Sequence, residues 1–229
     1  MSSPIKNPRI WVLHDRPLCL FEEVAGLQRS LLERIQKKEY NEDYIILTEF
    51  KPVITVGRRF HPEHLLDTQE ELVLKGIAFV EVDRGGDVTC HGPGQLVVYP
   101  LADLNYYGKD LRRWVFLLEE TLILTLDHWA LKGVRHEGEP GIWVRDRKIV
   151  SIGVGCSKWV TYHGLALNVD MDLSLFDSIV PCGLKGIAMT SMQRELGGDV
   201  SADEVKPIFL DYFKELMYLS SLARERGEA

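Results

Sequence analysis

Residues 142–169 read IWVRDRKIVSIGVGCSKWVTYHGLALNV, and this stretch decides the fold. Apolar and β-branched residues fill three runs, 142–144, 148–154 and 159–169, which short polar segments separate. No helical pattern lies between these runs. Antiparallel strands can be joined by a tight turn, whereas parallel strands need a crossover of about a dozen residues or more. The stretch therefore predicts a mixed, largely antiparallel sheet with helices packed on it, not a doubly wound nucleotide fold.

Helices and further strands are expected on both sides of this stretch. Apolar residues recur at spacings of three and four from Val24 to Ile35, which predicts a helix over 21–38. Ser201 and Glu204 have the spacing of a capping box, so a last helix is expected to begin near Ser201. The remaining expected elements are strands at 44–50, 53–56, 77–82 and 96–99 and a helix at 111–131.

Composition narrows the function classes. The 229 residues are 45% hydrophobic and 27% charged, with a net charge of -7, which is ordinary for a folded protein and argues against a general nucleic-acid binder. No apolar run approaches the roughly 20 residues of a membrane span, and the start of the chain does not resemble a secretory signal. Neither GxGxxG after a strand nor GxxxxGK[ST] is present. Since the chain has no repeat or linker, we expect one domain over 1–229. We expect the protein to be located in the cytoplasm.

The four cysteines, Cys19, Cys90, Cys156 and Cys182, form no CxxC pair and no zinc-spaced cluster. In a chain without a secretory signal we interpret them as free thiols. No metal and no cofactor are therefore expected.

A glycine-rich segment, RGGDVTCHGPGQ at 84–95, is the densest unusual feature. Its glycines allow close backbone approach, and its N–H groups can bind an anion or an oxyanion. Arg84 can hold a phosphate or a carboxylate. The alternative is a tight structural turn with a solvated arginine, and a neutral histidine bonded in the core at His91.

A charged segment, RDRK at 145–148, leads directly into an apolar strand. Lys148 lies where the strand enters the core, and a buried lysine can act as a base. A hairpin turn with exposed charges is the alternative.

Small residues at Gly164 and Ala166 keep one face of the strand 159–169 narrow. This leaves either a slot for a slim apolar ligand or space for a close backbone. The two explanations are equally compatible with the sequence.

Cys182 stands between Pro181 and Gly183, which places it in a loop. A loop exposes a thiol and suits a nucleophile. A half-buried structural cysteine is the alternative.

Taken together, the motifs RGGDVTCHGPGQ, KIVSIGVG, HGLALNV and PCGL, in that order, resemble the lipoyl(octanoyl) transferases over roughly residues 10–215. The resemblance implies an α/β (α+β) fold similar to the catalytic domain of biotin and lipoate protein ligases, with a core at about 41–222. It implies Cys182 as the nucleophile and Lys148 as its partner. Cys90 departs from the family, which often has an aromatic residue at this position. The residues that match the acyl-site segments of the family are Arg84, Gly85, Gly86, Asp87, Val88, Thr89, Cys90, His91, Ser151, Ile152, Gly153, Gly164, Leu165 and Ala166.

The same resemblance implies the reaction and its partners. The family moves an octanoyl group from octanoyl-acyl carrier protein to a lysine of lipoyl domains, in 2-oxoacid dehydrogenases and the glycine cleavage H protein, through a cysteine thioester. A monomer that binds neither nucleic acid nor membrane is expected. Because such carriers are commonly acidic, arginines such as Arg58 and Arg59 are expected around the entrance. Two alternatives stay open: an ATP-dependent lipoate or biotin protein ligase, and a non-catalytic module that binds acylated carriers.

Overall fold

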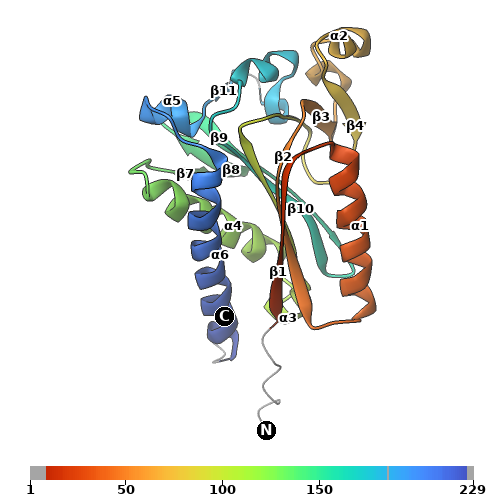
Figure 1. Ribbon diagram of the computed structural model, residues 1–229, viewed down its shortest axis with the longest axis vertical. Coiled ribbons are helices and arrows are strands. Elements are labelled where there is room, and N and C mark those ends of the chain that lie inside the picture. Colours follow the sequence, from red (N-terminus) through yellow and green to blue (C-terminus); the bar gives the residue numbers. More distant parts are fainter. Residues whose placement is uncertain (1–8, 185, 226–229) are drawn as a thin grey trace.

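Two β-sheets with helices packed around them make up the protein (Figure 1), a computed structural model that describes residues 9–184 and 186–225. The strands are β1 (Ile10–Cys19), β2 (Glu42–Phe50), β3 (Val53–Val56), β4 (Ala78–Glu81), β5 (Val88–His91), β6 (Gln95–Leu101), β7 (Val134–His136), β8 (Glu139–Val144), β9 (Arg147–Ser157), β10 (Val160–Asn168) and β11 (Ala188–Met189). The α-helices are α1 (Phe21–Lys37), α2 (Gln69–Leu74), α3 (Leu104–Tyr107), α4 (Leu111–Asp127), α5 (Met192–Leu196) and α6 (Ala202–Glu225). The 3₁₀ helices are η1 (Pro62–His64), η2 (Leu173–Ser178) and η3 (Pro181–Gly183).

The large sheet has the strand order β1-β2-β6-β10-β9-β8-β7, with β11 paired to β9, and the small sheet has the order β4-β3-β5. The pairs β1–β2, β3–β4 and β9–β11 are parallel, and the other pairs among the described strands are antiparallel. The predicted mixed, largely antiparallel α/β architecture is confirmed.

Two tight turns fold the stretch 142–169 onto itself. Arg145 and Asp146 join β8 to β9 with φ values of 51° and 63°, and Lys158 and Trp159 join β9 to β10 with φ values of 50° and 66°. Positive φ at both central residues is the backbone of a type I′ hairpin, whose twist matches that of the flanking strands. The charged segment 145–148 thus forms a hairpin turn, which was the structural alternative for it. Lys148, which follows the turn, is nevertheless buried.

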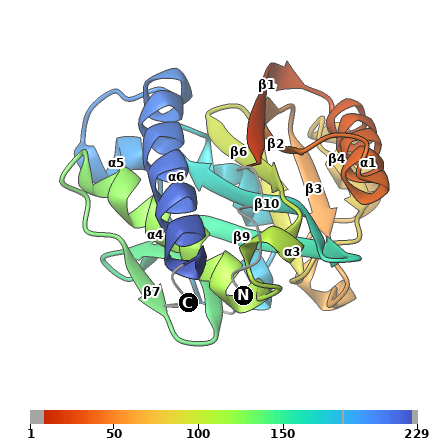
Figure 2. The same cartoon turned by 90° about the horizontal axis from the view of Figure 1, so that it is seen from below.

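Helices cover both faces of the large sheet. Tyr44 and Ile46 of β2 pack in a cluster with residues of α1, whereas their neighbours Ile45 and Leu47 pack in a cluster with residues of α4 and α6. Figures 1 and 2 show α1 on one side of the sheet and the α4–α6 pair on the other. Burial on both faces explains why the central residues of β2, Tyr44 to Leu47, are all apolar rather than alternating with polar ones. No helix in the described ranges is both long and apolar enough to span a membrane.

The expected elements are present, with differences at their ends. The capping box at Ser201 forms, since Ser201 N donates to Glu204 Oε2 at 2.8 Å, and α6 begins at the next residue. The helix expected over 111–131 ends at Asp127. The strand β1 was not predicted, because Pro17 interrupts its pattern; an edge strand tolerates proline. The strand β5 was also missed, since it lies inside the glycine-rich segment that we interpreted as a loop.

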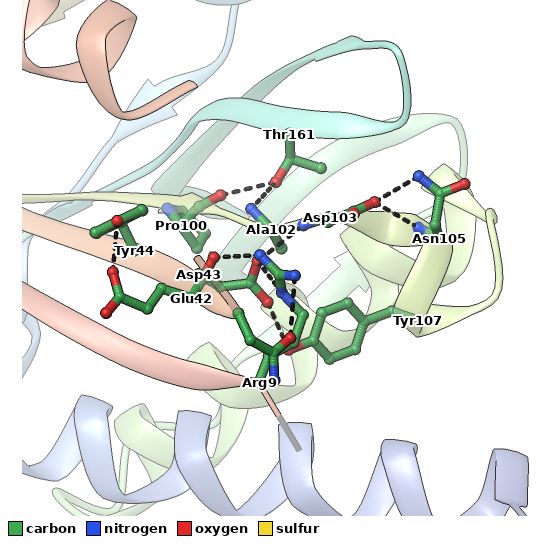
Figure 3. Close-up of polar contacts among 11 residues, drawn as sticks. Arg9, Glu42, Asp43, Tyr44, Pro100, Ala102, Asp103, Asn105, Tyr107 and Thr161 are labelled. Carbon is green, nitrogen blue, oxygen red and sulfur yellow. Dashed lines mark hydrogen bonds and ion pairs between the residues drawn. The ribbon is translucent and has the colours of Figure 1, made fainter. Parts of the chain in front are cut away.

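A buried polar cluster ties the start of β1 and β2 to the end of β6 and to α3 (Figure 3). Asp43 is fully buried and accepts bonds from Arg9 Nε (2.7 Å), Asp103 N (3.0 Å) and the Tyr107 hydroxyl (2.9 Å). Burial outweighs these donors and raises the pKa of Asp43 to about 6. No sequence pattern predicts the burial of this carboxyl, because Asp43 precedes an apolar run as many surface residues do.

Candidate active site

A cavity of about 480 Å³ opens where the glycine-rich segment, the strands β9 and β10, and the 3₁₀ turn η3 meet. The residues expected at the site that line this cavity are Arg84, Gly85, Gly86, Asp87, Val88, Thr89, His91, Lys148, Ser151, Ile152, Gly153, Gly164, Leu165, Ala166 and Cys182. Segments separated by up to a hundred residues in the sequence therefore face one space.

Cys182 and Lys148 are in direct contact. Lys148 Nζ lies 3.4 Å from Cys182 Sγ. Cys182 has a φ of 57°, a conformation that non-glycine residues rarely adopt and that costs free energy. This left-handed residue turns the chain sharply at η3 and leaves its thiol half-buried on the cavity wall.

Residues from β8 hold the lysine in place. Lys148 is 2% exposed, and its Nζ donates to Pro140 O at 3.3 Å and lies 4.6 Å from the centroid of the Trp143 ring. Gly141, with a φ of 136°, leaves the space that the lysine occupies, since a Cβ there would stand 2.9 Å from Lys148 Cε. The roles of Pro140, Gly141 and Trp143 were not predicted from the sequence. Their only sign was the Pro-Gly pair before a short apolar run.

Arg84 is buried in the cavity wall instead of being solvated. Its guanidinium donates to Thr55 O (2.7 Å), to Thr55 Oγ1 (3.0 Å) and to Gly85 O (3.0 Å), while Nε has no hydrogen-bond partner in the described part of the chain. Burial lowers the pKa of Arg84, and the proximity of Tyr99, Cys182 and Asp87 partly offsets this. The cavity wall thus contains a buried guanidinium as well as the lysine side chain.

His91 is a bonded core histidine, as the alternative interpretation held. Its Nδ1 lies 2.6 Å from Gln95 Oε1 and its Nε2 lies 3.4 Å from Thr55 Oγ1. Burial lowers the pKa of His91 to about 4, so the ring is neutral near pH 7. A second cavity histidine, His163, has its pKa lowered to about 3 for the same principal reason.

Cys90 does not line the cavity, contrary to its place among the expected site residues. Side chains alternate along β5, and Cys90 points into an apolar cluster with Ile54 and Phe176. It is 0% exposed, and burial raises the pKa of its thiol to about 12. A buried, protonated thiol is a poor nucleophile.

The strands β9 and β10 form the opposite wall. Gly153 pairs with Gly164, Ile152 with Leu165, and Ser151 with Ala166. The structure explains Gly164 by close backbone packing, since a Cβ there would lie 2.2 Å from Val98 O of β6. Gly153 makes room for a different group: its Cβ would lie 3.0 Å from Arg84 Cδ.

Of the two arginines expected at the entrance, one lines the cavity and the other is paired with an acidic residue. Arg59 lines the cavity. Arg58 is paired with Asp83 and donates to the Tyr162 hydroxyl at 3.0 Å.

His64 was not predicted as a site residue. It lines the cavity, and its Nδ1 lies 2.5 Å from Asp87 Oδ2. Among the described residues, no group of three or more His, Cys, Asp or Glu side chains is arranged to hold a metal ion.

Comparison with known proteins shows which family the chain resembles. Residues 22–214 match the family described as the lipoyl protein ligase A/B catalytic domain. The chain is 46% identical to an octanoyltransferase of Nitratidesulfovibrio vulgaris (strain DP4), over 91% of this chain and 94% of that protein. It is 41% identical to an octanoyltransferase of Maridesulfovibrio salexigens, over 86% of this chain and 92% of that one.

Solved structures agree at the level of the fold. A lipoate-protein ligase A bound with ATP superposes with a TM-score of 0.70 at 16% identity, covering 96% of this chain and 93% of that one. A bipartite lipoate protein ligase from Thermoplasma acidophilum, described together with its E2 lipoyl domain, gives 0.68 at 15% identity, covering 96% and 91%.

Proposed function

This chain belongs to the lipoyl protein ligase A/B catalytic-domain family and transfers octanoyl groups in protein lipoylation, and we propose that it carries the group between two partner proteins as a thioester on Cys182. The observation that supports this mechanism is the 3.4 Å contact between Lys148 Nζ and Cys182 Sγ inside the cavity. An ammonium at that distance stabilises a thiolate, and the thiolate is the reactive form of cysteine.

In the first step, Cys182 Sγ attacks the thioester carbonyl of the donor. A new carbon–sulfur bond forms, the bond to the donor's carrier breaks, and the carrier sulfur takes a proton from Lys148. The enzyme is left as an octanoyl thioester beside a neutral lysine. In the second step, the amine of the acceptor lysine attacks this thioester, an amide bond forms, and Cys182 leaves as a thiolate. Lys148 regains a proton from the acceptor nitrogen.

The cavity has the size and lining for an acyl chain. Its volume of about 480 Å³ falls in the usual range of small-ligand pockets, about 300–1,000 Å³. Ile152, Val154, Leu165 and Ala166 give it apolar walls, while Arg84 and Lys148 supply positive charge at the reacting end. Burying a methylene group contributes about 0.8 kcal/mol, so the chain itself supplies much of the binding free energy.

Lipoyl domains are the acceptors in this family of reactions, and the proposed donor is octanoyl-acyl carrier protein. The chain has a net charge of -7, so acidic carriers would be repelled unless the entrance is locally basic. Arg59 on the cavity wall provides such charge. We further propose that the enzyme acts as a monomer, on lipoyl domains of 2-oxoacid dehydrogenases and on the glycine cleavage H protein, in the cytoplasm, where its thiols stay reduced.

Intact-protein mass spectrometry after mixing with octanoyl-acyl carrier protein tests the mechanism. The expected result is one octanoyl adduct on the wild type and on Cys90→Ala, and none on Cys182→Ala. An adduct on Cys90 would move the nucleophile, and tight binding without any adduct would indicate a non-catalytic module. ATP-dependent lipoylation that survives in Cys182→Ala would instead indicate a ligase, whose acyl-adenylate chemistry needs no cysteine.

A further inference from the structure

The proposed reaction releases a proton that the Cys182–Lys148 pair cannot absorb. The acceptor lysine arrives as an ammonium and must lose two protons to become an amide nitrogen. The pair gives one proton to the leaving carrier thiol in the first step, so it can regain only one in the second. This count is the same whether the pair rests as thiolate and ammonium or as thiol and amine. The other proton must therefore reach solvent, and a second base in the cavity provides a route for it.

A histidine–aspartate pair stands against the residue that follows the nucleophile. His64 Nδ1 lies 2.5 Å from Asp87 Oδ2, and both residues line the cavity that contains Cys182. A Cβ on Gly183 would be 2.6 Å from Asp87 Oδ2 and 3.0 Å from His64 Nδ1. The side chains are 13% and 9% exposed, so the pair is enclosed yet reachable.

Backbone contacts fix this pair relative to the nucleophile. Val180 N donates to His64 O at 2.8 Å, and Leu65 forms a bridge with Ile179. His61 N donates to Asp87 Oδ1 at 3.3 Å, which holds the carboxylate from its other side. The segment 61–65 and the turn at Cys182 therefore form one structural unit.

Asp87 also selects the useful tautomer of the ring. A carboxylate only accepts hydrogen bonds, so Nδ1 of His64 carries the hydrogen and Nε2 keeps its lone pair for a proton. The other histidines of the site are poorly suited to this role. Burial lowers the pKa of His91 to about 4 and that of His163 to about 3, and His61 is an exposed side chain near Glu63.

Resting on the proposed function, we propose that His64, oriented by Asp87, is the base that takes the second proton from the acceptor lysine during transfer. The N–H bond of the acceptor breaks, His64 Nε2 gains the proton, and the imidazolium releases it to water at the cavity opening. The other titratable side chains that line the same cavity are Arg59, His61, Arg84, Asp87, His91, Tyr99, Glu139, Lys148, His163 and Cys182.

The test measures the two steps separately in rapid-quench experiments. Formation of the octanoyl-enzyme from octanoyl-acyl carrier protein gives the first rate, and decay of the isolated octanoyl-enzyme on adding a lipoyl domain gives the second. His64→Gln should reduce the second rate by about 10²-fold, the usual contribution of a general base, and the first by less than about threefold. The loss should shrink as the pH is raised from about 7 to about 9, because hydroxide then removes the proton.

Controls separate this role from a structural one. His128→Gln, at the exposed end of α4, should leave both rates unchanged. Asp87→Asn, which keeps the side-chain shape, should give the same selective loss and serves if His64→Gln does not fold. Equal losses in both steps would show that the pair only supports the turn at Cys182, and would overturn the inference. Absence of any wild-type adduct on Cys182 would instead overturn the proposed function together with it.

Discussion

Gly141 is the position where a single methyl group tests the geometry of the site most directly. Its φ of 136° is strained for any residue with a side chain, at a cost of about 1–3 kcal/mol. A Cβ there would lie 2.4 Å from Val150 O and 2.9 Å from Lys148 Cε, whereas ordinary contact begins at 3.4 Å. The strands β8 and β9 must therefore separate by about 1 Å, and the lysine must move by about half as much.

Gly141→Ala should consequently slow acylation of Cys182 by about 10-fold, since a displacement of about 1 Å can cost about 10²-fold in rate and the lysine moves about half that distance. Its free energy of unfolding should fall by about 1–3 kcal/mol. The assays are rapid-quench mass spectrometry for the octanoyl adduct and urea denaturation for stability.

Gly76→Ala is the matched control. Gly76 has a positive φ of 69°, and nothing lies within 4 Å of its added Cβ. This variant should lose stability through the same backbone strain and acylate at the wild-type rate. If Gly141→Ala acylates as fast as Gly76→Ala, the position of Lys148 does not depend on the space at Gly141, and the reasoning is refuted.

Three further outcomes are expected. Lys148→Arg keeps a positive charge but cannot give up a proton, so transfer to the lipoyl domain should fall by about 10²-fold or more; a normal rate in the same quench assay would show that Lys148 is no base. Cys90→Ser should acylate normally and lose about 1–3 kcal/mol of stability in urea, because a hydroxyl replaces a buried apolar thiol; loss of acylation would contradict its structural role. Asp43 has a folded-state pKa of about 6 against an ordinary 3.8, so the folded state binds more protons in between, and stability should fall by roughly 3 kcal/mol as the pH rises from about 3 to about 7; urea titrations of Asp43→Asn should lack this slope, and an unchanged slope would assign it elsewhere.

Local patterns in the sequence determined most of the secondary structure and the chemistry available to it. The spacing of apolar residues predicted α1, and the three runs in 142–169 predicted the hairpins of β8, β9 and β10. Such periods arise within a few residues, so they are visible without the fold. The linked motifs also identified Cys182 and Lys148 as candidates for the reaction.

The tertiary structure alone decided which of these groups meet. Cys182 and Lys148 touch because the chain after β10 passes through η3 and then pairs as β11 with β9, a relation set by strand pairing between distant segments. Cys90 and His91 are neighbours in sequence, yet the pleat of β5 sends the thiol into the core and the ring to the cavity wall. A shift of one residue in register would turn the His91 ring into the core and the Cys90 thiol to the cavity wall. Register depends on non-local packing and hydrogen bonds, which no short window of sequence contains. The contact between His64 and Asp87 likewise joins residues that are 23 positions apart in the sequence.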